Sequence, residues 1–261
     1  METVKFSNNL MPSTTIIIPA YNEEVRIGKI LEEIKDFVAT NNVKWDVVVS
    51  IDGNDGTEEI VKGISSSYPF IKYNKGQGRS GKGNAIKRVI NSSTGEFTLI
   101  MDADGAVSLV DIIKNFHYLT DCDVILFDRY STDGNRIPLY RWVPSRGFNI
   151  LVRTMLGLNV RDTQCGYKIV RTDLIKEAFK RVGVTNSFFD VALLYHIKKM
   201  QGRIKEVDVM YVHDEKSKFK IGAEIIGQGV SLLAFRLRHS RFFKYAPHWA
   251  IDLYLRKFRW I

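Results

Sequence analysis

The pattern that decides the fold begins at residue 14, and residues 14–38 read TTIIIPAYNEEVRIGKILEEIKDFV. The β-branched run Thr14–Ile18, which ends at Pro19, is typical of a buried strand. Asn22 then offers a cap for a helix whose first turn holds Glu23 and Glu24. Apolar side chains follow at helical spacing: Ile27, Ile30, Leu31, Ile34, Phe37 and Val38. The segment therefore predicts a strand followed by an amphipathic helix.

This strand–helix unit recurs along the first half of the chain. Further strands are predicted at Trp45–Ile51, Phe70–Tyr73, Phe97–Met101 and Asp123–Phe127, with helices after Thr57, Gly83 and Ser108. Because the strands are almost continuously apolar, we expect an α/β fold: a mostly parallel, Rossmann-like sheet with helices on both faces. Ligands bind beyond the carboxyl ends of such strands. That rule selects four loops, at residues 19–24, 52–57, 75–83 and 102–105.

The pattern is less regular from about Tyr140. It predicts helices around Phe148–Leu156 and over Ser187–Met200, and strands over Thr163–Val170 and Arg203–Val212. Residues 222–238 and 246–258 have the pattern of two amphipathic helices. We therefore expect a loose segment at residues 1–12, one domain at 13–220 and C-terminal helices at 221–261.

The positive charge is concentrated in the C-terminal segment. The chain has 38 Lys and Arg against 29 Asp and Glu, a net charge of +9. Residues 236–261 hold seven of the basic residues and one acid, so +6 of the +9 lies there. The segment is also rich in aromatic residues, a mixture that suits the surface of an anionic membrane. Stacking on single-stranded nucleic acid and docking on the core are the alternatives, and we favour the membrane over nucleic acid as the partner.

The two cysteines, Cys122 and Cys165, are too few for a disulfide framework, and no Cys/His cluster has the spacing of a zinc site. Cys165 has no histidine nearby in the sequence, so we interpret it as a packed thiol. The N-terminus lacks the apolar core of a signal peptide, and no segment reaches the ~18 apolar residues of a membrane span. We therefore expect a cytoplasmic protein without a transmembrane helix, peripheral on the cytoplasmic face of a membrane.

Acidic residues follow two of the predicted strands. Asp102 and Asp104 come directly after one strand, and a pair so spaced can share a hard divalent cation that also binds phosphate. An acidic strand-to-helix loop is the alternative. Asp52 ends another strand, where a glycine turn with Thr57 as a helix cap would also explain the sequence. Two acid-bearing strand ends in one sheet favour a shared site.

The glycine loop at residues 76–83, GQGRSGKG, matches the dinucleotide pattern G-x-G-x-x-G and nearly matches a phosphate-binding P-loop. Gly83 stands where a P-loop needs Ser or Thr, so the P-loop is disfavoured. The preceding strand is short and polar, and two strand–helix units come before it, which disfavours dinucleotide binding. The loop is then either a mobile glycine loop or a lid over a diphosphate, with Arg79 and Lys82 as counter-charges.

Arginines form the third group of candidates: Arg129, Arg141, Arg146 and Arg153. Guanidinium groups suit bidentate recognition of phosphate, although arginines on exposed helix faces are common. Asp162 follows this group. It could be a salt-bridge partner, or a base and positioning group beside an acceptor phosphate.

Taken together, these residues resemble family 2 glycosyltransferases with the GT-A fold. The resemblance is carried by Pro19–Glu24, the acid–glycine turn at Asp52, Gly81-Lys-Gly83 and Asp102-Ala-Asp104. Later segments are similar to the dolichyl-phosphate glucosyltransferase branch and other polyprenyl-phosphate sugar synthases: Asp102–Ala106, Asp162–Lys168, Phe189–Val191, Leu193-Leu194, Ser217-Lys218 and Phe235–Arg238. The chain departs from the family at the turn after Asp52, which has one acid fewer, at Ala192 in place of Glu, and at Phe188 in place of Trp.

The resemblance implies a role for each candidate. It assigns nucleotide-sugar binding to Pro19, Tyr21, Glu23, Asp52, Lys82, Asp102, Ala103 and Gln164. It assigns Mg²⁺ or Mn²⁺ to Asp102 and Asp104, the acceptor phosphate to Arg129, Arg141 and Arg146, and catalysis to Asp162 together with Asp104.

The implied activity is inverting, metal-dependent transfer of a hexose from a nucleotide sugar to a polyprenyl or dolichyl phosphate, with UDP-glucose as the favoured donor. A mannose or N-acetylhexosamine donor, a soluble or protein acceptor, and a catalytically silent nucleotide-sugar binding protein are the alternatives. A phosphate monoester has a second pKa of ~6 and is already an anion at pH 7. We therefore expect Asp162 to position groups as much as to remove a proton.

Overall fold

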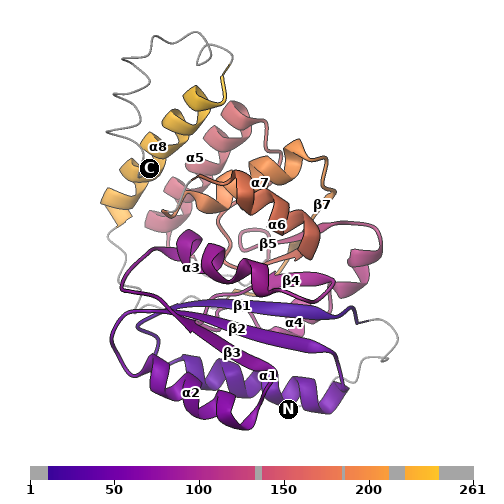
Figure 1. Cartoon of the computed structure of the whole chain (residues 1–261). Helices are drawn as coiled ribbons and strands as arrows, with labels where there is room; N and C mark the ends of the chain where they lie inside the picture. The colour runs from indigo at the N-terminus through magenta and orange to yellow at the C-terminus, as the bar shows by residue number, and fades with distance from the viewer. Residues whose placement is uncertain (1–10, 133–136, 184–185, 212–220, 241–261) are drawn as a thin grey trace.

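The computed structural model describes residues 11–132, 137–183, 186–211 and 221–240. Within them, seven strands form one sheet in the order β3-β2-β1-β4-β6-β5-β7 (Figure 1). The strands are β1 Thr14–Tyr21, β2 Trp45–Asp52, β3 Ile71–Lys75, β4 Phe97–Ile100, β5 Val124–Asp128, β6 Lys168–Arg171 and β7 Ile204–Asp208. Only β6 runs antiparallel to its neighbours. The predicted α/β fold with a mostly parallel sheet is thus confirmed.

Helices cover both faces of the sheet (Figure 1). Side chains alternate along β1, so that Ile16 and Ile18 enter one core cluster and Ile17 enters the other. The first cluster is covered by α1 Ile27–Asn41, α2 Thr57–Ser67 and α4 Leu109–Ile113. The second is covered by α3 Lys82–Val89, α5 Leu139–Leu156, α6 Thr172–Arg181, α7 Phe189–Lys199 and α8 Ile221–Arg238. Short 3₁₀ turns occur at Ile90–Ser92 and Phe116–Thr120.

Two predicted boundaries around the first loop are wrong. β1 continues through Pro19 to Tyr21, because β1 pairs with β4 only as far as Ile17 and a proline on the unpaired side breaks no ladder bond. Asn22 does not cap α1, which begins five residues later at Ile27. Instead Asn22 has a positive φ of 56°, and its side chain accepts a hydrogen bond from the Asn54 amide at 3.1 Å.

The second half of the chain follows the prediction more loosely. The predicted strand Thr163–Val170 is ordered as a strand only from Lys168, because residues 162–167 serve as a loop at the sheet edge. None of the described helices is long and apolar enough to cross a bilayer. The predictions for residues 1–10 and for a helix at 246–258 fall outside the described residues.

Candidate active site

The candidate residues meet at one edge of the sheet. Parallel strands β1, β2, β4 and β5 end at this edge, and antiparallel β6 begins there. The loops after the four parallel strands therefore adjoin the segment that leads into β6. This arrangement brings Asp162 and the residues around it to the paired acids Asp102 and Asp104, from which they are about 60 residues distant in sequence.

The loops after β1 and β2 interlock through their polar groups. The amide of Glu23 donates to the Thr57 hydroxyl at 2.8 Å, and the amide of Gly56 donates to the Glu24 carboxylate at 2.8 Å. Gly53 has φ +94°, and a Cβ there would stand 1.9 Å from the side-chain oxygen of Asn22. A glycine is therefore required at this position, and the two loops form a single wall of the site.

Asp52 is buried behind the glycine loop. One carboxylate oxygen accepts hydrogen bonds from the amide and the hydroxyl of Ser80, at 2.9 and 2.6 Å. The other oxygen pairs with Arg88 of α3 at 2.9 Å, and a Cβ on Gly76 would strike that oxygen at 2.3 Å. Burial opposes the charge, but the bonds from Ser80 and Arg88 outweigh it and lower the pKa of Asp52. Asp52 thus fixes the glycine loop, and Arg88 is a participant that the sequence did not indicate.

The anchored loop presents its own arginine to the end of β1. The Arg79 guanidinium lies 5.0 Å from the ring centroid of Tyr21, a cation–π contact. Tyr21 is half exposed and follows Pro19 in the strand. The structure therefore brings the glycine loop against the half-exposed ring of Tyr21, while Pro19 and Glu23 lie two residues before and after it.

The acids after β4 have different partners. Asp102 forms an ion pair with Lys82, the first residue of α3. Asp104 accepts a hydrogen bond from the Tyr167 hydroxyl at 2.9 Å and from the Ala106 amide at 3.1 Å. Ala103 between them is buried in the first core cluster, so its side chain faces away from the acids. Tyr167 was not singled out from the sequence, because it falls within the predicted strand Thr163–Val170, where an aromatic residue is usually a core residue.

Both acids are half-buried, and their pKa values move in opposite directions. Burial raises the pKa of Asp104, and the neighbouring Asp102 carboxylate raises it further. Burial also disfavours charge on Asp102, but Lys82 outweighs it and lowers the pKa of Asp102. The same pairing raises the pKa of Lys82 despite its burial. Two adjacent, half-buried carboxylates, of which only Asp102 is paired with a lysine, favour the binding of a further positive charge.

This donor set fits a hard divalent cation. Carboxylate oxygens are the ligands that Mg²⁺ and Mn²⁺ prefer, and Mg²⁺ is commonly held by one or two carboxylates together with substrate phosphates. The described residues contain no group of three or more His, Cys, Asp or Glu side chains placed to bind a metal. A cation here would therefore be held by Asp102 and Asp104, with the rest of its coordination supplied by substrate and water.

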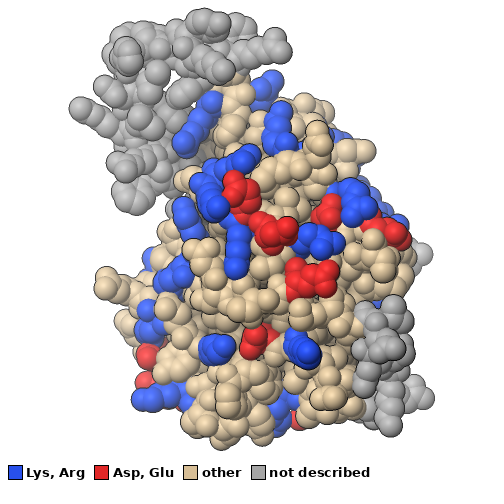
Figure 2. Space-filling view, turned by 45° about the vertical axis from the view of Figure 1, so that its right-hand side comes forward, with Lys and Arg blue, Asp and Glu red and all other residues tan. Residues whose placement is uncertain are grey.

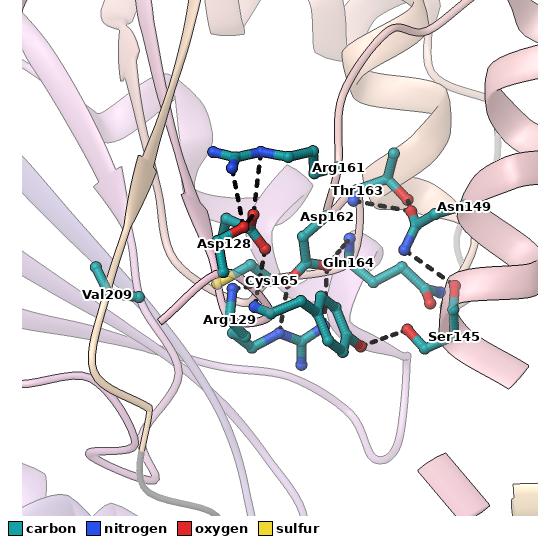
Figure 3. Close-up of polar contacts among 12 residues, drawn as sticks. Asp128, Arg129, Ser145, Asn149, Arg161, Asp162, Thr163, Gln164, Cys165 and Val209 are labelled. Atoms are coloured by element: carbon teal, nitrogen blue, oxygen red, sulfur yellow. Dashed lines mark hydrogen bonds and ion pairs between the residues drawn. The ribbon is translucent and has the colours of Figure 1, made fainter. Parts of the chain in front are cut away.

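Arg129 and Asp162 form a buried bidentate pair beside these acids (Figure 3). Arg129 Nε and Nη2 donate to the two carboxylate oxygens of Asp162 at 2.7 and 3.0 Å. The Asp162 side chain is fully buried, and it also accepts a hydrogen bond from the Gln164 amide at 3.1 Å. Burial opposes the charge of Arg129, yet Asp162 raises its pKa well above the usual value. Asp162 therefore keeps Arg129 charged and holds it in one orientation.

The ring of Tyr130 lies between two of the predicted acceptor arginines. Arg129 and Arg146 lie 5.4 and 5.7 Å from its centroid, and its hydroxyl bonds to Ser145 of α5 at 2.5 Å. Buried Asp128 fixes the loop by accepting a hydrogen bond from the Tyr130 amide at 2.9 Å. Arg141 lies nearer the start of α5, where it contacts Tyr140 instead. Of the three predicted arginines, the structure thus brings Arg129 and Arg146 together.

A buried ion pair beneath the site was also missed. Lys168 of β6 and Asp190 of α7 are 2.6 Å apart, with side chains only 1% and 8% exposed. The Lys168 ammonium also donates to the carbonyl of Cys165, so the pair secures the loop that carries Asp162 and Gln164. A lysine in a strand usually indicates that the strand is the outermost one of its sheet. No sequence signal showed that β6 lies between two other strands.

We expect Lys168→Met to lower the free energy of unfolding by about 3–5 kcal/mol, because it leaves the buried Asp190 carboxylate without a partner. Urea denaturation followed by circular dichroism measures the change. Lys180→Met is the matched control, because the pair that Lys180 forms with Glu177 is exposed. Equal, small effects of the two substitutions would refute the structural role given to Lys168.

The thiol of Cys165 is not placed to act as a nucleophile. Cys165 is buried, and burial raises the pKa of its thiol to about 12. Its interpretation as a packed thiol agrees with this environment.

Comparisons with known proteins converge on one family. Residues 15–179 match the family model described as "Glycosyl transferase family 2". A dolichyl-phosphate beta-glucosyltransferase of Trichomonas vaginalis is 31% identical over 244 residues, covering 86% of this chain and 72% of that protein. A dolichyl-phosphate beta-glucosyltransferase of Mus musculus is 28% identical over 247 residues, covering 86% and 75%.

Solved structures agree in fold. Glucosyl-3-phosphoglycerate synthase of Mycobacterium tuberculosis, crystallised with Mn²⁺, UDP and glucosyl-3-phosphoglycerate, superposes with a TM-score of 0.64 at 16% identity. The match covers 88% of this chain and 81% of that one. Mannosyl-3-phosphoglycerate synthase of Rubrobacter xylanophilus also gives a TM-score of 0.64, covering 87% and 74% of the two chains. At this identity the likeness establishes the fold.

Proposed function

Because the chain belongs to glycosyl transferase family 2 and is therefore a glycosyltransferase, we propose that it transfers glucose from UDP-glucose to the phosphate of a polyprenyl carrier such as dolichyl phosphate. The observation that carries the proposal is the juxtaposition of paired acids with paired arginines. Arg129 lies close enough to Asp102 to lower the pKa of that acid. One edge of the sheet thus offers both a cation site for a leaving diphosphate and guanidinium groups for an acceptor phosphate. The names of the curated relatives support glucose and dolichyl phosphate as the substrates.

The donor would bind against the loops after β1 and β2. Tyr21 and Arg79 offer stacking surfaces for the uracil ring, with Pro19 and Glu23 beside them. Asp52 would act on the nucleotide partly through the glycine loop, whose Ser80 it holds. The M. tuberculosis structure with UDP supports a uridine nucleotide in this fold.

The diphosphate would lie at the acids after β4. Asp102 and Asp104 would hold Mg²⁺ or Mn²⁺, which supplies the charge that stabilises the leaving UDP. Lys82, now paired with Asp102, offers a second positive group for the diphosphate or the sugar. The Mn²⁺ in the M. tuberculosis complex supports metal dependence here. The Tyr167 hydroxyl keeps the Asp104 carboxylate oriented.

The acceptor phosphate would be bound by Arg129 and Arg146, with Arg141 approaching from the start of α5. In a single inverting displacement, a phosphate oxygen forms a bond to C1 of glucose while the bond from C1 to the UDP oxygen breaks. The phosphate monoester is already an anion at neutral pH, so no strong base is needed. Both oxygens of Asp162 are engaged by Arg129, which supports a positioning role for this acid. Gln164, from the same loop, would face the sugar.

A lipid acceptor requires the enzyme to work at a membrane. The proposal therefore includes peripheral contact with an anionic membrane on its cytoplasmic face, through the C-terminal residues 221–261. Of these, residues 221–240 form α8 and its end, and residues 241–261 lie outside the described part of the chain.

The proposal predicts that release of UDP from UDP-glucose requires both a divalent cation and a polyprenyl phosphate. A coupled assay for UDP, with EDTA and acceptor-free reactions as controls, measures both requirements. Release at an unchanged rate without acceptor would contradict the proposal, because it would show hydrolysis rather than transfer to a lipid phosphate.

A further inference from the structure

Helix α5 carries a row of apolar side chains that face solvent. Leu139, Val143 and Ile150 are separated by four and seven residues, so they lie along one side of the helix. Their exposed fractions are 75%, 58% and 58%, and Tyr140 and Leu151 beside them are also exposed. The opposite side of α5 is buried through Phe148 and Val152. Apolar side chains that are exposed next to one another, rather than singly, indicate a docking surface.

Helix α8, which lies beside α5, carries a second row of this kind. It packs against α5 (Figure 1) and has its own exposed row, Ile226, Leu233 and Leu237, at intervals of seven and four residues. Its other side, with Leu232 and Phe235, enters the second core cluster. We call the exposed apolar side chains of the two helices the apolar face.

The charges of these two helices suit an anionic partner. α5 contains three arginines and no acid, and α8 contains two arginines and one acid, Glu224, so the pair carries +4. In Figure 2, which is turned from Figure 1 about the vertical axis, Lys and Arg predominate at the height of α5 and α8, and most acids lie lower. An apolar row bordered by arginines matches a bilayer of anionic lipids, in which acyl chains lie beneath negative headgroups.

Helix α5 also borders the acceptor site. Ser145 bonds to the Tyr130 hydroxyl, Arg146 lies over the Tyr130 ring, and Asn149 Oδ1 accepts a hydrogen bond from the Thr163 hydroxyl at 2.7 Å (Figure 3). Arg146 lies seven residues after Leu139 and four before Ile150, so one helix carries both the apolar row and an arginine of the acceptor site.

We propose that the apolar face lies on an anionic bilayer, so that α5 brings the arginines of the acceptor site to the level of the lipid headgroups. This inference rests on the proposed function only in taking the acceptor to be a membrane lipid. The binding of the face to a bilayer is itself independent of the reaction.

Cysteine footprinting tests the contact with the full-length protein. Val143→Cys introduces a thiol on the face, and the two native cysteines give little background because both are buried. We expect saturating vesicles of phosphatidylcholine and phosphatidylserine to slow labelling of this thiol by a water-soluble maleimide by about tenfold or more, because a thiol buried below the headgroups is shielded from a reagent in water. Val25→Cys is the matched control. Val25 is 89% exposed and lies before α1, so its labelling should not change with vesicles.

Three results would overturn the proposal. Labelling of Val143→Cys that is unaffected by anionic vesicles would exclude the bilayer. Slow labelling without lipid at every protein concentration would show that the chain itself covers the face, and slow labelling only at high concentration would show that a second copy does.

A second variant links the face to turnover. Leu139→Ser/Ile150→Ser should reduce transfer to a polyprenyl phosphate embedded in anionic vesicles by about tenfold or more, and leave transfer to a short-chain, water-soluble prenyl phosphate unchanged. Equal loss with both acceptors would overturn the proposal, because the residues would then serve the fold or the site. If wild-type enzyme used neither acceptor, the proposed function would fail, and the labelling result would still decide the membrane contact.

Discussion

Asp104→Ala reduces glucosyl transfer by about a thousandfold or more, the largest effect that we expect from any single substitution. Asp104 is one of only two acids that the described site offers to a divalent cation, and its partner Asp102 is already paired with Lys82. In the proposed mechanism, Asp104 helps to hold the cation that would compensate the charge developing on the leaving UDP, and the substitution removes this ligand. Initial rates at saturating UDP-glucose and metal, measured for wild type and variant, give the ratio.

The matched control is Asp111→Ala. This acid on α4 forms a partly exposed ion pair with Lys114, which is its one ion pair among the described residues. Its rate should equal that of wild type. Binding of Mn²⁺ with UDP, measured by calorimetry, should be lost in Asp104→Ala while the thermal unfolding transition persists. A variant that keeps more than about a tenth of the wild-type rate would show that Asp104 does not hold the metal.

Asp162→Asn, in contrast, should retain measurable transfer, lower than wild type by about 10- to 100-fold. Asparagine can still accept one hydrogen bond from Arg129, but the bidentate, charge-assisted pair is lost. Arg129→Met should lower the transfer rate about a thousandfold, since it removes the guanidinium proposed to bind the acceptor phosphate and leaves buried Asp162 without its ion-pair partner. The assay is transfer as a function of acceptor concentration.

The pattern across these variants distinguishes a positioning acid from a base. If Asp162 positions Arg129, Asp162→Asn should raise the KM for the acceptor and leave the pH dependence of kcat as in wild type. Complete loss of activity in Asp162→Asn, equal to that of Asp104→Ala, would contradict the positioning role and favour proton transfer.

The sequence predicted the fold well because the deciding signals are local. Continuous apolar runs such as Trp45–Ile51 indicate a strand covered on both faces, and the rule for parallel sheets then places Asp52 and Asp102 at one edge. The antiparallel β6 could not be foreseen in this way. A strand was predicted over Thr163–Val170, but the direction and the central place of β6 depend on its pairing with β4 and β5.

The structure brings most of the predicted candidate residues together, but many of their hydrogen bonds and ion pairs were not predicted. Asn22 resembles a helix cap in sequence, yet it bonds to a loop that is 32 residues away along the chain. Asp52 has the expected place, but Ser80 and Arg88 occupy its carboxylate, a contact set by the packing of α3 on the sheet. Tyr167 acquires its role because β6 begins where β4 ends. Contacts of this kind depend on the tertiary structure and leave no periodic signal.

The most direct test of the proposed activity is to measure the transfer of labelled sugar to a lipid phosphate. The enzyme is incubated with Mg²⁺ or Mn²⁺, a polyprenyl phosphate and one radiolabelled donor from a panel: UDP-glucose, GDP-mannose and UDP-N-acetylglucosamine. The mixture is then extracted with organic solvent. We predict that label from UDP-glucose enters the organic phase with wild type and not with Asp104→Ala. Label that remains in the aqueous phase for every donor would show that the enzyme does not transfer sugar to a polyprenyl phosphate.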